Sequence, residues 1–178
     1  MKALIASDIH GSSFYAAELQ RVVAGEKPDL IVLLGDFLYS GPRNPVKDDY
    51  NPKAVVEILN RLADKIFAVR GNCDADIDVE VLSFPLPRQN EVTLNNRRLV
   101  LIHGDDQDLE KLHLRKGDVL LYGHTHLPQM KSVDGVMVLN PGSLSFPKGG
   151  YPHTYMLLDE KEVRLIDLAG RTLEVRSL

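Results

Sequence analysis

Seven side chains of the types that bind metal ions follow directly after short apolar stretches of this sequence. They comprise carboxylates, one amide and imidazoles, and they are Asp8, His10, Asp36, Asn72, His103, His124 and His126. Five separate apolar stretches end in this way, which is too regular for chance. In open α/β sheets, ligands bind beyond the carboxyl ends of the strands. We therefore expect these seven side chains to meet in one site.

The mixture of carboxylate and imidazole groups indicates which ions the site would hold. Mn2+, Zn2+, Fe2+ and Ni2+ accept both ligand types, whereas Ca2+ and Mg2+ prefer oxygen ligands alone. Seven ligands exceed the need of one ion with an open coordination position, but they suit two ions that share a carboxylate. We predict two divalent metal ions, with Mn2+ as the preferred metal and Asp36 as the shared ligand.

Two such ions have a well-defined chemistry. At about 3.5–4 Å apart, they can hold a bridging hydroxide at neutral pH, align it with a phosphorus atom and stabilise the charge that develops on the phosphoryl oxygens. The seven residues therefore predict hydrolysis of a phosphate ester. A simpler explanation is that each polar residue turns or caps its strand, but a turn does not require histidine.

The elements that must position these residues alternate between strand and helix in the first part of the chain. Aliphatic stretches at 2–6, 30–34 and 66–69 are typical of buried strands, and a polar cluster follows each one. Between them, apolar residues at helical spacing predict helices over 13–25 and 52–62. This order is typical of parallel, doubly wound α/β sheets.

From residue 92 onward, the pattern predicts antiparallel hairpins instead. Asn95-Asn96 separates one pair of apolar stretches and Asp134-Gly135 separates another, and such dipeptides favour tight hairpin turns. One more aliphatic stretch lies at 119–122, and the stretches after residue 154 predict an antiparallel tail. The fold class is therefore α/β with two kinds of sheet.

The bulk composition restricts where the protein acts and what it binds. A net charge of -4 disfavours a stable nucleic-acid complex, which needs clustered Lys and Arg. The single cysteine, Cys73, fits a reducing compartment. No apolar stretch approaches the roughly 20 residues that span a membrane. We expect one cytoplasmic domain over 1–178 without membrane attachment, whose apolar C-terminal hairpins offer a surface for homo-oligomers.

The ordered motifs resemble those of the calcineurin-like metallophosphoesterase family. The motifs that carry the resemblance are Asp8-x-His10, Gly35-Asp36, Gly71-Asn72-x-Asp74, His103-Gly104 and Gly123-His124-x-His126. Within the family, the chain resembles the small YfcE-type bacterial phosphodiesterases through Gly41-Pro42-Arg43-Asn44, Asn140-Pro141-Gly142-Ser143 and Pro147-Lys148-Gly149-Gly150. The similarity extends through essentially the whole chain, so the expected activity is hydrolysis of a small phosphodiester.

The resemblance implies a four-layer α/β/β/α sandwich and a division of the ligands between two ions. One ion would take Asp8, His10, Asp36 and His126, and the other would take Asp36, Asn72, His103 and His124. The residues alone do not divide the ligands in this way. We further expect Asn72 to orient the phosphoryl group, and Asp74 to hold a metal-binding imidazole in place.

Cys73 departs from the pattern of the wider family. Many members have a histidine after the Gly-Asn pair that is thought to protonate the leaving group, whereas this chain has Cys73. A thiol with an ordinary pKa near 8.5 is a weaker acid than imidazolium, whose pKa is about 6.5. We predict a preference for aryl or nucleotide-type diesters, whose leaving groups need little protonation. The alternative is that Cys73 is a small packing residue without a catalytic role.

A few other polar residues have a functional and a structural interpretation. Arg43 and Lys148 are candidates to bind the substrate phosphate, although exposed loop cations are commonly solvated. His113 and His153 are expected to be structural. The acidic run at 105–108 is expected to be the solvated start of a helix.

Two other functions share the same ligands or the same fold. The first is a catalytically silent platform that binds protein partners, as the retromer subunit of this fold does. Retention of all seven ligands argues against it, because only hydrolysis requires them. The second is a phosphomonoesterase. A dianionic monoester needs more positive charge than Arg43 and Lys148 supply, so the sequence favours a diester.

Overall fold

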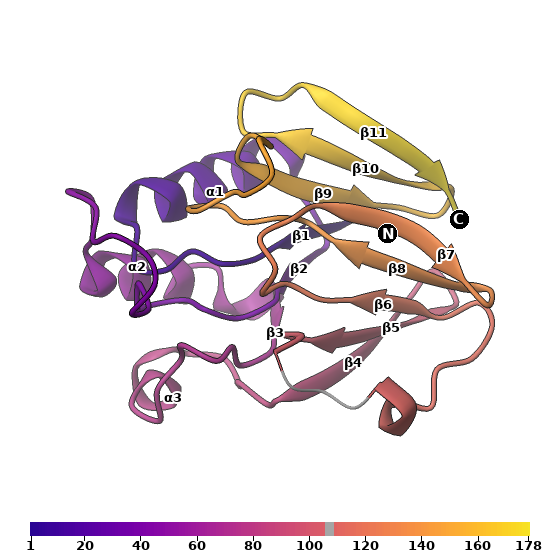
Figure 1. Cartoon of the computed structure of the whole chain (residues 1–178), viewed down its shortest axis with the longest axis horizontal. Helices are drawn as coiled ribbons and strands as arrows, with labels where there is room; N and C mark the ends of the chain where they lie inside the picture. Colours follow the sequence, from indigo (N-terminus) through magenta and orange to yellow (C-terminus); the bar gives the residue numbers. More distant parts are fainter. Residues whose placement is uncertain (106–108) are drawn as a thin grey trace.

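A computed structural model describes residues 1–105 and 109–178 and shows two β-sheets stacked face to face (Figure 1). The larger sheet has the strand order β11-β10-β9-β1-β2-β3, and the smaller has the order β4-β5-β6-β8-β7. Residues 106–108 of the acidic run, and with them its expected role, lie outside the described residues. None of the helices in the described ranges is long and apolar enough to cross a membrane.

The six-stranded sheet is built around β1. Its strands are β1 (Ala3–Ala6), β2 (Leu30–Leu33), β3 (Ile66–Ala68), β9 (Thr154–Leu158), β10 (Glu162–Asp167) and β11 (Thr172–Ser177). The first three run parallel to one another, and β9 pairs antiparallel with β1. Both the predicted parallel unit and the predicted antiparallel tail are confirmed, and they share one sheet.

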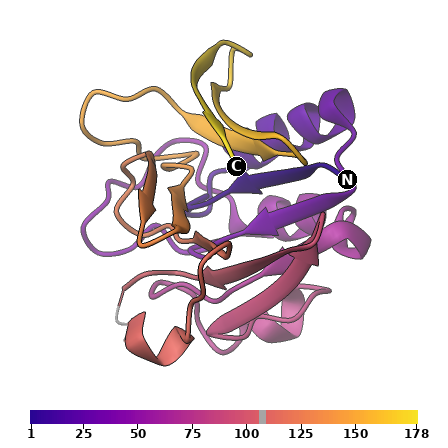
Figure 2. The same cartoon turned by 90° about the vertical axis from the view of Figure 1, so that its right-hand side faces the viewer.

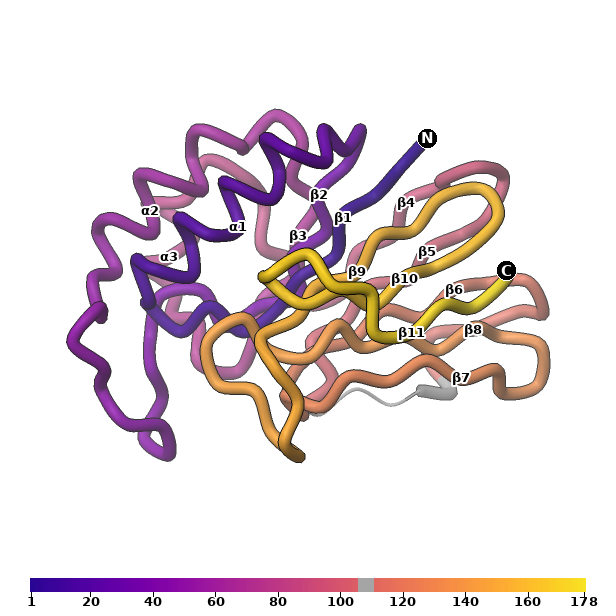
Figure 3. The backbone as a smooth tube through the Cα atoms, turned by 90° about the horizontal axis from the view of Figure 1, so that it is seen from above, coloured from indigo at the N-terminus to yellow at the C-terminus, as the bar shows by residue number. Residues whose placement is uncertain are grey.

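The two long helices, α1 (Ser13–Glu26) and α2 (Pro52–Asn60), connect the parallel strands and cover one face of this sheet, and the short η1 (Ala63–Lys65) directly precedes β3. The short α3 (Asp78–Val81) lies between β3 and the first strand of the other sheet. Asn51 caps α2 by accepting a hydrogen bond from the Ala54 N–H at 3.2 Å. Figure 3 shows α1 and α2 on the side of the molecule opposite β7 and β8.

The five-stranded sheet combines the two predicted hairpins with parallel pairing. Its strands are β4 (Gln89–Leu94), β5 (Arg97–Ile102), β6 (Val119–Leu121), β7 (Gln129–Val133) and β8 (Val136–Asn140). The β4-β5 and β7-β8 pairs are antiparallel hairpins, whereas β6 pairs parallel with both β5 and β8. The hairpin pattern did not predict this parallel pairing, which points the carboxyl ends of β5 and β6 in the same direction.

Among the residues that the structure describes, three apolar cores hold the layers together. Alternate residues of β1 face different cores, because successive side chains of a strand point to opposite faces. Leu4 and Ala6 pack toward α1 and α2, and Ala3 and Ile5 pack between the two sheets. This explains why the strands are continuously aliphatic.

A single short helix packs on the outer face of the five-stranded sheet among the described residues. Leu112 at the end of the 3-10 helix η2 (Leu109–Leu112) packs there with Val100 and Leu120. Figure 2 shows this helix, in salmon, on the opposite side of the molecule from the indigo α1. The expected four-layer α/β/β/α sandwich is confirmed, with a fourth layer that is much smaller than the first.

Candidate metal centre

The seven predicted ligands lie in loops that directly follow strands of both sheets. Asp8 and His10 follow β1, Asp36 follows β2, Asn72 follows β3, His103 follows β5, and His124 and His126 follow β6. These loops are tied together by backbone hydrogen bonds, from Asp8 N to Gly35 O at 3.2 Å and from Gly123 N to His103 O at 2.9 Å. The two sheets meet at the same place, because Nε2 of His10 after β1 lies 3.2 Å from Nε2 of His126 after β6.

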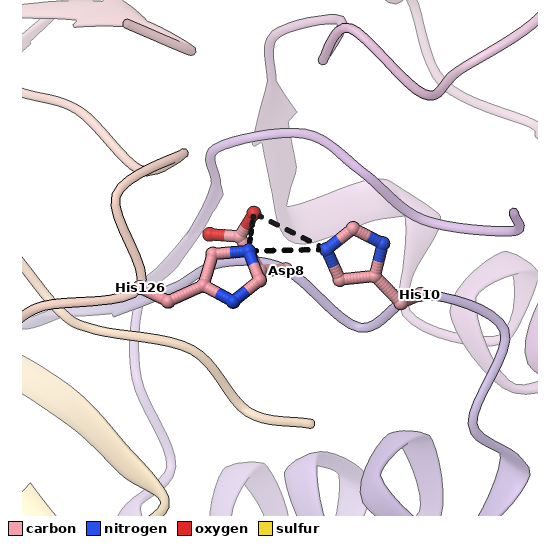
Figure 4. A group of neighbouring side chains, drawn as sticks. All are labelled: Asp8, His10 and His126. Atoms are coloured by element: carbon pink, nitrogen blue, oxygen red, sulfur yellow. Dashed lines mark hydrogen bonds and ion pairs between the residues drawn. The ribbon is translucent and has the colours of Figure 1, made fainter. Parts of the chain in front are cut away.

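Asp8, His10 and His126 form one group of converging atoms (Figure 4). The Nε2 atoms of His10 and His126 lie 3.2 Å apart. Oδ1 of Asp8 lies 3.6 Å from Nε2 of His10 and 3.3 Å from Nε2 of His126. Three side chains from loops after β1 and β6 thus aim their ligand atoms at a common point.

Asn72, His103 and His124 form a second group. Oδ1 of Asn72 lies 3.1 Å from Nε2 of His103 and 2.8 Å from Nδ1 of His124. The two imidazole rings are arranged edge to face, with centroids 5.1 Å apart. The amide oxygen and two imidazole nitrogens are therefore close enough to share one ion.

Asp36 contacts both groups. Its Oδ2 atom lies 3.6 Å from Nε2 of His10 and 3.4 Å from Nε2 of His103, while its Oδ1 atom accepts a hydrogen bond from the Cys73 N–H at 2.8 Å. Asp8, Asp36 and His103 also place ligand atoms within 4.8 Å of one another. The Asp36 carboxylate thus occupies the position that a ligand shared by two ions would need.

Backbone carbonyl groups orient three of the imidazoles. The Nδ1 atoms of His10, His103 and His126 face the carbonyl oxygens of Tyr39, Leu34 and Phe146 at 2.9, 2.6 and 2.7 Å. In a neutral imidazole, an Nδ1–H that donates to a carbonyl leaves Nε2 without a proton and free to bind an ion. Sequence reasoning did not identify Tyr39 and Phe146, because a carbonyl partner leaves no signature in residue type.

Asp74 has a different role from the one predicted. Its carboxylate accepts hydrogen bonds from the backbone N–H groups of Asp36, Phe37 and Gly71 at 2.8, 2.7 and 2.7 Å. These three partners are backbone groups and not imidazoles, and the side chain is only 5% exposed. Asp74 therefore anchors the loop of the central carboxylate, and the prediction that it holds an imidazole was wrong.

Five of the seven predicted ligands have a left-handed backbone conformation. The φ angles are 60° at Asp8, 50° at His10, 57° at Asp36, 61° at His124 and 60° at His126. This region is uncommon for residues other than glycine, and such strain concentrates at functional sites. The left-handed turns at the strand ends therefore fall on the predicted ligands themselves.

Gly71 allows the loops after β2 and β3 to approach closely. A Cβ atom at Gly71 would meet the Asp36 side chain and its backbone nitrogen at distances that no real Cβ atom tolerates. Any larger residue at position 71 would push Asp36 away from the site. The glycine beside Asn72 is therefore needed for packing against the central carboxylate.

The electrostatics of the site fit a bound cation. Both carboxylate oxygens of Asp8 are buried without a hydrogen-bond donor among the described residues, and an uncompensated buried carboxylate is costly. Burial alone would raise the pKa of Asp8, but the neighbouring imidazoles of His10 and His126 hold it well below its usual range. Burial likewise opposes the charged form of His103, yet Asp36 raises the pKa of His103 to about 9. Carboxylates kept ionised in a buried cluster of imidazoles are suited to divalent metal ions.

Cys73 lies beside the site but is poorly suited to acid-base chemistry. Burial, together with the nearby Asp36 carboxylate, raises the pKa of the thiol to about 12. Its Sγ atom lies 3.4 Å from Nδ2 of Asn72. The thiol therefore remains protonated at neutral pH and is a weak proton donor.

A cleft of about 370 Å³ opens over the predicted ligands. Arg43 and Lys148, the two candidates for phosphate binding, both line it and are exposed. His153 does not: it stacks on Tyr15 with ring centroids 4.2 Å apart and bonds to it at 2.8 Å. His113 is exposed and does not line the cleft. The structural interpretation of these two histidines is therefore supported.

Lys47 contacts the loop segment whose carbonyl group orients His126, and sequence reasoning missed it. Its ammonium group donates to Ser145 O at 2.6 Å and lies 4.4 Å from the centre of the Phe146 ring. Phe146 O is the partner of His126, and Ser145 Oγ donates to Ile9 O at 2.5 Å. Lys47 lies in a Gly-, Pro- and Asn-rich loop, where a lysine would ordinarily be solvated, so no local signal marks it.

Comparisons with known proteins agree with this geometry. The family model described as "Calcineurin-like phosphoesterase superfamily domain" matches residues 1–163. Phosphodiesterase YfcE of Escherichia coli (strain K12) is 42% identical over 175 residues, which cover 97% of this chain and 95% of that protein.

Solved structures extend the comparison to the fold. The structure of the E. coli phosphoesterase YfcE superposes with a TM-score of 0.94 at 41% identity and covers 99% of both chains. Vps29 of Entamoeba histolytica, solved in complex with Zn2+, shares the fold with a TM-score of 0.62 at 23% identity, covering 100% of this chain and 97% of that chain. The chain therefore belongs to the calcineurin-like phosphoesterase superfamily.

Proposed function

We propose that this chain is a metal-dependent phosphodiesterase that acts on small phosphodiesters with two divalent ions. The observation that carries the proposal is the position of Asp36, whose carboxylate contacts both His10 and His103. The 42% identity with a phosphodiesterase across nearly the whole chain supports the diester as substrate. When bound, the two ions supply an activated water and offset charge on the phosphoryl oxygens.

The contacts within the site support the division of ligands that the family resemblance implies. Asp8, His10 and His126 would hold one ion, Asn72, His103 and His124 would hold the other, and Asp36 would serve both. The Nδ1 atom of His124 faces this group, whereas His10, His103 and His126 present Nε2. Mn2+ is the proposed metal, because it accepts carboxylate, amide and imidazole ligands together.

The other residues of the cleft position the substrate. With its Oδ1 atom directed at the imidazoles, Asn72 presents its Nδ2–H2 group toward the cleft side, where it can donate to a phosphoryl oxygen. Arg43 and Lys148 provide positive charge at the cleft wall for the same group. Cys73 contributes no effective general acid, so substrates with good leaving groups are favoured.

The proposal has two rivals, and the site disfavours both. The Vps29 structures share the fold, but a silent platform would have no need for seven converging ligands with strained backbones. A phosphomonoesterase would share the metal centre, but its dianionic substrate calls for more cationic side chains than Arg43 and Lys148 in the cleft lining.

The test is metal reconstitution followed by turnover of two substrates. The protein is stripped of metal, Mn2+, Ni2+, Zn2+ or Mg2+ is added back singly, and hydrolysis of bis-p-nitrophenyl phosphate is compared with that of p-nitrophenyl phosphate. We expect the highest rate with Mn2+ and a clear preference for the diester. A preference for the monoester would identify a phosphomonoesterase, and no turnover with any ion would favour the platform.

A further inference from the structure

A second hollow of about 470 Å³ lies next to the metal cleft. Its walls come from the chain after β2, the first turns of α2 and the segment that contains α3, and they include Tyr39, Tyr50, Val56, Ile77 and Val81. We call this hollow the apolar groove. In contrast, the cleft over the predicted ligands is lined by Arg43, Asn44 and Lys148 as well as by five of those ligands.

The apolar groove adjoins the metal cleft. Cys73 lines both hollows, so the two meet at this side chain. Tyr39, on the groove wall, also provides the carbonyl oxygen that faces Nδ1 of His10 at 2.9 Å. A molecule with its phosphoryl group over Asp36 and Asn72 can therefore extend past Cys73 into the groove.

Lys53 is the one exposed charged side chain among the described residues that line the groove. The Asp78 carboxylate accepts the Ala75 N–H at 2.8 Å and is 5% exposed. Flat aromatic groups bind well between apolar and aromatic walls of this kind.

The groove also leaves large apolar side chains in contact with water. The exposed fractions are 49% for Tyr39, 57% for Ile77 and 41% for Val81. Contiguous exposed apolar surface beside a polar site commonly marks a ligand-binding groove. A ring placed here would remove this surface from water, at about 25 cal/mol for each Å² buried.

We propose that the apolar groove binds an aromatic ester group of the phosphodiester whose phosphoryl group lies at the metal centre. The inference rests on the proposed function and narrows its substrate class to diesters that carry an aryl ring or a nucleobase. A diester has two organic groups, so one can lie in the groove while the other extends from the cleft into solvent. Specificity would then reside in the segment around α3, which contains none of the seven predicted ligands.

The test measures binding without turnover. Phenylphosphonate and methylphosphonate share the metal-binding group and differ in the ring, and their Kd values for the Mn2+-loaded protein are obtained by isothermal titration calorimetry. We expect phenylphosphonate to bind about tenfold more tightly. Adenosine 5′-monophosphate is the third ligand, and it distinguishes a nucleobase reached across a ribose from a bare aryl ring.

Three variants in one short segment test whether the preference for phenylphosphonate over methylphosphonate comes from the groove. Ile77→Ala and Val81→Ala each remove a groove side chain and should reduce the preference for the phenyl compound by about threefold or more, while leaving methylphosphonate binding unchanged. Val79→Ala is the matched control, because Val79 is 47% exposed on the same helix and does not line the groove. Thermal unfolding of each variant checks that the segment remains folded.

The outcomes separate this inference from the proposed function. An equal affinity of the wild-type protein for the two phosphonates would overturn the groove assignment, as would an equal loss of preference in Val79→Ala and Ile77→Ala. Selective phenylphosphonate binding without any diester turnover would support the groove and overturn the phosphodiesterase. Diester turnover without ring selectivity would support the phosphodiesterase and overturn the groove assignment.

Discussion

The Oδ2 atom of Asp36 lies 3.4 Å from Nε2 of His103, and both side chains are almost completely buried. This pair joins the loop after β2 in one sheet to the loop after β5 in the other. It raises the pKa of His103 to about 9 against the opposing effect of burial. Without metal, the pair is therefore an ion pair between the two sheets at neutral pH.

Stability of the metal-free protein should fall as the pH rises from 7 to 9. Unfolded His103 loses its proton near pH 6.5, whereas folded His103 keeps it until about pH 9, so the folded state holds more protons across this window. The expected loss is on the order of 2–3 kcal/mol. Urea unfolding at pH 7, 8 and 9 with a chelator present measures it. His103→Asn should flatten the profile, and an unchanged slope in that variant would contradict the assignment.

Asp36→Asn should weaken binding of both metal ions. The neutral amide keeps the shape of the side chain but removes the charge that lies close to both His10 and His103. We expect metal affinity to fall by at least about tenfold at each site, and activity to fall with it. Equilibrium dialysis with elemental analysis measures the metal content. Two full equivalents of metal in this variant would remove Asp36 as the shared ligand.

Asp74→Asn should destabilise the loops that carry the metal ligands. The Asp74 carboxylate accepts hydrogen bonds from three backbone N–H groups. An asparagine has one acceptor oxygen, so its NH2 group would face at least one of these donors and that hydrogen bond would be lost. A cost of about 2–3 kcal/mol in the free energy of unfolding is expected, together with weaker metal binding. Asp76→Asn is the control, since the Asp76 side chain is 97% exposed and pairs with Arg70. Equal losses in the two variants would contradict the anchoring role.

Lys47→Met should reduce the affinity for Mn2+ without abolishing folding. Methionine keeps part of the apolar stem but loses the hydrogen bond to Ser145 O and the cation over the Phe146 ring. Because Phe146 O orients His126, we expect affinity to fall by about three- to tenfold. Lys47→Arg retains the charge and should recover most of the loss. Calorimetric titration with Mn2+ measures the change, and an unaltered Kd in Lys47→Met would show that the lysine does not position the ligand.

Cys73→His should improve the hydrolysis of alkyl diesters relative to p-nitrophenyl diesters. The thiol, with a pKa of about 12, is a weak acid, whereas an imidazolium can protonate a poor leaving group and contributes about 10²-fold or more when well placed. The ratio of kcat/KM values for the two substrate types is the readout. Cys73→Ser is the control, because a hydroxyl of similar size supplies no better acid. A ratio that stays the same in Cys73→His would support a purely structural role for Cys73.

Sequence reasoning singled out the seven candidate ligands because their signal is local. Each of the seven follows an aliphatic stretch within a few residues, and the chemical type of a side chain is written in the sequence. The helices at 13–26 and 52–60 and the turns at Asn95-Asn96 and Asp134-Gly135 were equally accessible, since periodicity and turn residues act over short distances. The family resemblance then supplied the sandwich architecture that these local patterns do not determine.

Tertiary structure decided how those residues are arranged and supported. The Nε2 atoms of His10 and His126 meet although 116 positions separate them, and Asp36 reaches His103 only because the two sheets stack with these strand ends together. The carbonyl partner of His103 depends on the same stacking. The backbone partners of Asp74 depend on the pairing of β2 with β3, and the contact of Lys47 with Ser145 joins two loops that lie far apart in the sequence. Contacts of this kind are set by the packing of distant strands, and no short stretch of sequence encodes the distance between two loops.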